Sequence, residues 1–91
     1  MNYEKIDARI EAMKDEMIQD MKRWIAVPSV QGPAAENAPF GAENRRMLDL
    51  AMADAKKYGF GVRDFDGYAC DISFGEGEQT LGMLCHLDVV P

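Results

Sequence analysis

Cysteine, basic charge and long apolar runs are all scarce in this chain. The two cysteines, Cys70 and Cys85, are too few for a disulfide scaffold, and both lie in apolar stretches where reduced, buried thiols are expected. Ten basic side chains against sixteen acidic ones leave a net charge of −6, which disfavours a nucleic acid or an anionic membrane as a partner. No run approaches the roughly 20 apolar residues of a membrane span, and the charged N-terminus is unlike a signal peptide. We therefore expect a cytoplasmic protein.

The length of 91 residues allows one small domain, taken here as residues 1–91. Hydrophobic residues make up 47% of the chain, which is ordinary for a globular protein and too high for a disordered one. A domain this short buries a modest fraction of its surface, so its stability should be marginal without a partner or further chain.

Two helices are predicted in the first two thirds of the chain. Residues 3–27 place apolar side chains at helical spacing, and the run ends before Pro28: Ile6, Ile10, Met13, Met17, Met21 and Trp24. A methionine-rich stripe can form an adaptable peptide groove, but core packing is favoured here. Residues 28–41 hold three of the four prolines and predict a loop. A second helix is expected over about 43–58, with Gly59 as its C-terminal stop.

The last third of the chain predicts strands, and the fold class is therefore α/β. Residues 61–65 and 68–74 flank Asp66-Gly67, a strong hairpin signal, and residues 80–86 form an apolar third strand. We expect both helices to pack on one face of this three-stranded sheet. A strand that is apolar on every side needs cover on both faces, which little else in the chain provides. Exposure of residues 80–86 and dimerisation or strand exchange through them are therefore expected.

His86 and Asp88 follow the apolar run and carry the candidate chemistry. Residues two apart on an extended chain project to the same side, so these two side chains should point together at a strand end. A carboxylate beside a histidine fixes the ring tautomer and leaves the other nitrogen for a metal ion. The spacing alone is weak evidence for a metal site, since a lone histidine near an apolar strand is more often structural than a metal ligand.

The stretch "GMLCHLDVVP" (82–91) resembles the first metal-binding signature of the dinuclear-zinc peptidases, which include bacterial dipeptidases, carboxypeptidases and aminoacylase-type deacylases. "WIAVPSV" (24–30) is similar to the end of that family's first helix, and "PFGAENRRMLDLAMADAKKYGFGV" (39–62) to its second helix and the following turn. "YACDISFGEGEQTLGMLCHLDVVP" (68–91) resembles its hairpin and signature strand. Pro-Phe-Gly before the second helix and "GEGE" in the turn are typical of the bacterial dipeptidase branch.

The resemblance implies a role for each of the two residues. His86 would be a zinc ligand, and Asp88 would be the catalytic carboxylate that orients its ring. The family uses two zinc ions, with manganese or cobalt as possible substitutes, and the other ligands and the general base match no residue of this chain. We therefore expect an amino-terminal fragment of a longer dipeptidase acting on small peptides. The fragment alone should be inactive and should bind no metal tightly.

Two alternatives stay open from the sequence. A deacylase or desuccinylase of the same family fits the same residues, because nothing before Pro91 fixes the substrate. A self-associating α/β module without catalysis would also explain the apolar run at 80–86.

Overall fold

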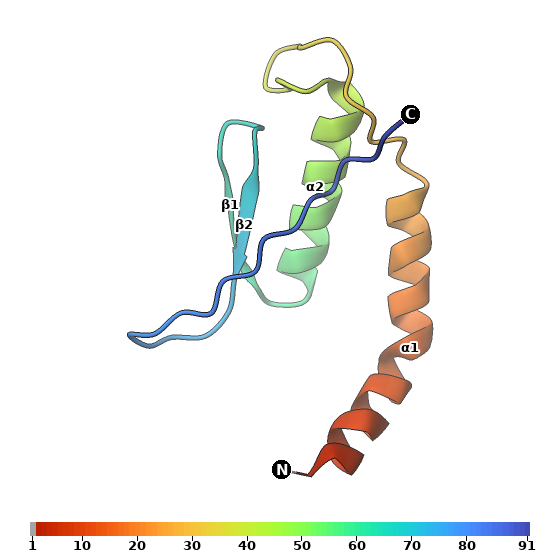
Figure 1. Cartoon of the computed structure of the whole chain (residues 1–91), viewed down its shortest axis with the longest axis vertical. Coiled ribbons are helices and arrows are strands. Elements are labelled where there is room, and N and C mark those ends of the chain that lie inside the picture. The colour runs from red at the N-terminus through yellow and green to blue at the C-terminus, as the bar shows by residue number, and fades with distance from the viewer. Residues whose placement is uncertain (1) are drawn as a thin grey trace.

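A computed structural model describes residues 2–91 as two helices followed by a β-hairpin (Figure 1). Helix α1 spans Tyr3–Ile25 and α2 spans Ala42–Lys57, while strands β1 (Gly61–Asp64) and β2 (Cys70–Ser73) pair antiparallel. The radius of gyration, 15.5 Å, exceeds the roughly 12 Å of a compact domain of this length. The α/β arrangement is therefore open, and the N-terminal half of α1 extends beyond α2 (Figure 1).

Helix α1 begins at a side-chain cap and ends two residues earlier than predicted. The Asn2 Oδ1 atom accepts hydrogen bonds from the backbone N–H groups of Glu4 and Lys5, which satisfies two of the free donors of the first turn. The expectation that the apolar stripe of α1 packs into a core is correct only for Trp24, which is partly buried against the core cluster, and no α1 residue is fully buried. Along residues 6–21 the stripe stays 39–54% exposed, since α1 contacts α2 and neither strand.

Helix α2 is the element around which the rest is arranged. It contacts α1 and both strands, so the predicted packing of both helices on the sheet is correct for α2 and wrong for α1. Its side chains Met47 and Ala51 form the core with Val27, which follows α1. Three partly buried side chains pack against this cluster: Trp24, Leu50 and Leu87. The core therefore joins the end of α1, the middle of α2 and the C-terminal segment.

The predicted hairpin turn is confirmed at Asp66-Gly67. Both residues have positive φ, 56° and 79°, as a type I′ turn requires. A Cβ atom at Gly67 would lie 2.5 Å from the Asn37 carbonyl oxygen, so glycine is needed for space as well as for φ. Arg45 of α2 pairs with Asp64 at 2.6 Å, which joins the hairpin to α2 and lowers the pKa of the Asp64 carboxyl.

The predicted third strand does not form, and the sheet has two strands instead of three. Residues 80–86 run without regular hydrogen bonding, and their large apolar side chains are exposed: Leu81, Met83 and Leu84. A strand that is apolar on both faces is stable in a sheet only where both faces of the sheet are covered. Here α2 is the only helix that packs on the hairpin, so a third strand would have one apolar face in water. The expected exposure of the run is thus observed, but as an irregular segment. Cys85 is exposed with it, contrary to the prediction of a buried thiol, whereas burial raises the pKa of the half-buried Cys70.

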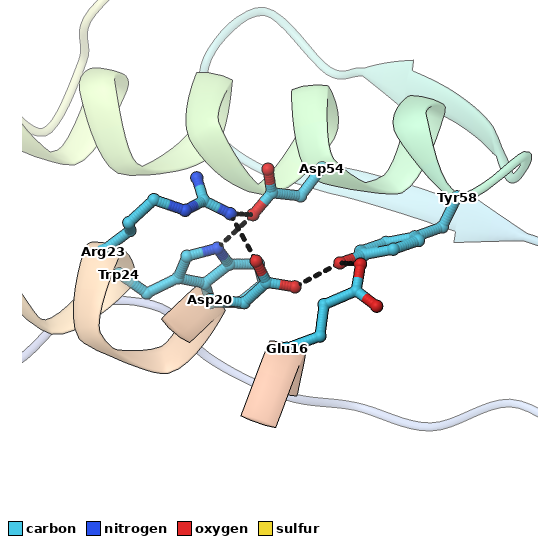
Figure 2. A network of polar contacts seen from close by, with 6 residues as sticks. All are labelled: Glu16, Asp20, Arg23, Trp24, Asp54 and Tyr58. Carbon is cyan, nitrogen blue, oxygen red and sulfur yellow. Dashed lines mark hydrogen bonds and ion pairs between the residues drawn. The ribbon is translucent and has the colours of Figure 1, made fainter. Parts of the chain in front are cut away.

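A buried carboxylate joins the two helices. Asp54 of α2 is 7% exposed, and its Oδ2 atom accepts hydrogen bonds from the Arg23 guanidinium and the Trp24 indole N–H, both at 2.7 Å (Figure 2). The hydrogen bond from Arg23 holds the pKa of the Asp54 carboxyl below its usual range. Asp54 therefore stays charged, with two donors on its Oδ2 atom, at the contact between α1 and α2.

The same network continues along α1 toward the N-terminus. Asp20 pairs with Arg23 at 2.7 Å, and the Tyr58 hydroxyl lies within hydrogen-bond distance of both Asp20 and Glu16 (Figure 2). These two carboxylates raise the pKa of the Tyr58 hydroxyl, since they stabilise its protonated form. The polar contacts between the helices thus come from residues 16–24 of α1, and residues 3–15 lie beyond them.

Replacing Asp54 with alanine should lower the free energy of unfolding by about 2 kcal/mol, because two hydrogen bonds to a buried charge are lost. The matched control is Asp49→Ala on the same helix, where an exposed carboxylate pairs with Arg45 and the cost should stay within about 0.5 kcal/mol. Urea unfolding followed by fluorescence of Trp24, the only tryptophan, measures both variants. Equal losses in the two variants would contradict a special role for Asp54.

Candidate functional site

His86 and Asp88 lie together on the C-terminal segment. The His86 Nδ1 atom is 3.1 Å from the Asp88 carbonyl oxygen and 3.3 Å from the Asp88 carboxylate. Both oxygens accept hydrogen bonds, so in the neutral ring the proton is assigned to Nδ1. The lone pair is then on Nε2, to which no hydrogen bond is found among residues 2–91. This arrangement leaves one imidazole nitrogen free to bind a cation.

The pair is on the surface, not at the end of a buried strand. The side chains of His86 and Asp88 are 85% and 65% exposed. The predicted position at the end of a third strand is wrong because residues 80–86 do not join the sheet. The predicted projection of the two side chains toward each other agrees with their contact.

Leu87 separates the two polar residues and faces the other way. Its side chain packs against the core cluster of Val27, Met47 and Ala51. On an extended segment neighbouring side chains alternate in direction, so the packing of the partly buried Leu87 against the core directs His86 and Asp88 to solvent. The imidazole and the carboxylate therefore face solvent on a segment that Leu87 holds to the core.

Ser29, in the loop after α1, anchors this segment through two hydrogen bonds. Its hydroxyl donates to the Leu87 carbonyl oxygen at 2.9 Å, and its own carbonyl accepts from the Val89 N–H at 3.1 Å. Ser29 is 2% exposed. Sequence reasoning missed this contact, because a serine after a proline signals only a turn and its partners Leu87 and Val89 lie 58 and 60 residues away. Figure 1 shows the C-terminal segment passing α2 to reach this loop.

The described residues supply one oriented imidazole but no group of ligands for a metal ion. Among residues 2–91, no three His, Cys, Asp or Glu side chains converge in a geometry that could hold a metal. A catalytic zinc usually needs three protein ligands. These residues therefore fit the role of one ligand in a larger metal site, but they do not form a complete metal site by themselves. No helix within the described part of the chain is long and apolar enough for a bilayer crossing.

Comparison with known proteins relates this chain to dipeptidases. It is 39% identical over 85 residues to proteins named "Putative dipeptidase" in Staphylococcus aureus strains USA300, NCTC 8325 and N315. The aligned region covers 91% of this chain and 18% of each of those proteins. The chain thus spans less than a fifth of the length of the curated relatives it matches. No protein-family model matches the chain.

Proposed function

We propose that these 91 residues are the opening part of the catalytic domain of a metal-dependent dipeptidase. The observation that carries this proposal is the similarity to the S. aureus proteins named "Putative dipeptidase", together with the paired His86 and Asp88. The proposed substrates are small peptides. The proposed compartment is the cytoplasm, where free thiols such as Cys70 and Cys85 stay reduced.

His86 is proposed as a metal ligand through Nε2, and Asp88 as the carboxylate that orients the ring through Nδ1. This division of roles is supported by the contact of Nδ1 with Asp88 and by the exposure of the imidazole. The proposed metal is zinc, as two ions, with manganese or cobalt as substitutes. Such a pair of ions, when bound, supplies hydroxide near neutral pH and polarises the carbonyl of the scissile bond.

The rest of the metal site is proposed to come from protein beyond these 91 residues. One histidine provides a single ligand, and no other acidic or thiol side chain in the described residues converges with the pair. The 91 residues alone are accordingly proposed to be inactive and to bind zinc weakly. A deacylase or desuccinylase is a variant of this proposal with a different substrate, since His86 and Asp88 do not select the acyl group.

In a longer polypeptide that carries these residues, His86→Ala should abolish dipeptide hydrolysis, because a ligand of the metal centre is removed. Asp88→Ala should lower kcat/KM by about 10- to 100-fold, the usual effect of losing the group that orients a ligand. Release of free amino acids from a dipeptide measures both. Parallel assays with N-acetyl and N-succinyl amino acids separate the dipeptidase from the deacylase.

Cys85→Ser is the matched control, since it changes the exposed neighbour of His86 and leaves the proposed ligand in place. This variant should keep the activity of the parent. Near-normal turnover in His86→Ala would overturn the ligand assignment, and loss of turnover in Cys85→Ser would indicate thiol chemistry instead.

A second candidate is a self-associating module without catalysis, and the exposed apolar segment at 80–86 favours it. Leu81, Met83 and Leu84 are all more than four-fifths exposed on a segment without regular hydrogen bonding. A second copy of the chain could cover them by dimerisation or strand exchange.

This candidate predicts a dimer in sedimentation velocity at tens of micromolar. Leu84→Lys should convert the dimer to a monomer, because a charge cannot be buried in an apolar contact without a partner. The control Ile25→Lys changes an exposed apolar side chain of α1 and should leave the dimer intact. A wild-type chain that is monomeric under these conditions would rule the candidate out.

A further inference from the structure

We propose that Ser29 is the positioning residue for the His86–Asp88 pair. The inference rests on the proposed function, in which that pair binds and orients a metal ligand. No hydrogen bond joins Ser29 to either side chain of the pair. It acts on the backbone that carries them, through the two hydrogen bonds it forms with Leu87 and Val89.

The two hydrogen bonds hold the backbone on both sides of Asp88. The Leu87 carbonyl belongs to the peptide group before Asp88, and the Val89 N–H belongs to the peptide group after it. Fixing both peptide planes restricts φ and ψ of Asp88, since each peptide group is itself planar. The direction of the Asp88 carbonyl and of its side chain is thereby set.

The two oxygens that accept from the His86 ring both belong to Asp88, so their positions depend on how the Asp88 backbone is held. Nδ1 lies 3.1 Å from the Asp88 carbonyl oxygen and 3.3 Å from its carboxylate, so the tautomer of the ring depends on where Asp88 is held. The segment before His86 cannot do this, because residues 80–86 have no regular hydrogen bonding and are exposed. Leu87 holds the segment to the core through its side chain, and Ser29 fixes how the backbone is rotated there.

Ser29 is suited to this task by its own surroundings. It is 2% exposed, so water competes little for its hydroxyl and carbonyl. It follows Val27 and Pro28, of which Val27 is in the core and Pro28 has a fixed φ. An alanine at this position keeps the backbone acceptor and removes only the hydroxyl donor. Threonine retains the hydroxyl.

NMR of the 91-residue chain tests the inference in wild type, Ser29→Ala and Ser29→Thr, with Ser73→Ala as a control at an exposed serine of β2. Two quantities are measured: hydrogen exchange of the Val89 amide, and the His86 tautomer from its ring ¹⁵N shifts under mildly alkaline conditions. In Ser29→Ala the Val89 amide keeps its acceptor, the Ser29 carbonyl. It should still exchange about tenfold faster, because loss of the hydroxyl hydrogen bond to Leu87 makes local opening of the segment easier. The ring should shift from the Nδ1–H toward the Nε2–H tautomer, and Ser29→Thr should restore both values.

The outcomes separate this inference from the proposed function. Unchanged exchange and tautomer in Ser29→Ala would overturn the role of Ser29 while leaving the His86–Asp88 pair intact. Faster exchange with an unchanged tautomer would reduce Ser29 to a structural contact and would also overturn positioning. If the wild-type His86 ring showed no preference for the Nδ1–H tautomer, the His86–Asp88 interaction itself would be contradicted. The assignment of His86 as a metal ligand, on which the proposed function depends, would then fail as well.

Discussion

The packing of Leu87 on Val27, Met47 and Ala51 is the contact on which the candidate site depends. It brings the C-terminal segment to α2 and to the loop after α1, although the sequence separates them by several tens of residues. Because Leu87 points inward, His86 and Asp88 point outward, and because the segment is close to the loop, Ser29 can hydrogen-bond its backbone. Without this contact His86 and Asp88 would lie on a segment that nothing holds to the core.

The open shape of the molecule and the single ligand of the proposed metal site are explained in the same way. Helix α1 contacts only α2, no residue of α1 is buried, and the apolar segment at 80–86 is exposed. Exposed apolar surface of this kind is typical of a polypeptide that packs against further protein. The chain spans 18% of the proteins it resembles, which supports the proposal that further protein covers this surface and supplies the other ligands of the proposed metal site.

Local signals in the sequence predicted the local structure well. The helical spacing, the proline after α1, Gly59 after α2 and the Asp66-Gly67 turn act over a few residues, and the elements they predict lie within two residues of the expected bounds. Long-range features were not predictable in this way. The apolar stripe of α1 indicates a surface that should be buried, and so does the run at 80–86. Neither pattern tells whether other residues of this chain will cover that surface. The contacts of Asp54 with Arg23 and Trp24, and of Ser29 with Leu87, join residues 30 to 58 positions apart, which no periodicity reveals.

The most direct measurement is a ¹³C-edited NOE spectrum of the 91-residue chain with labelled methyl groups. If the C-terminal segment is anchored as described, the Leu87 methyls should give cross-peaks to the methyl groups of Met47, Ala51 or Val27. The methyls of Leu81 and Leu84, which lie on the exposed part of the same segment, should give none to these residues. Leu87 methyl shifts equal to those of a disordered peptide, with no cross-peak to this cluster, would contradict the account.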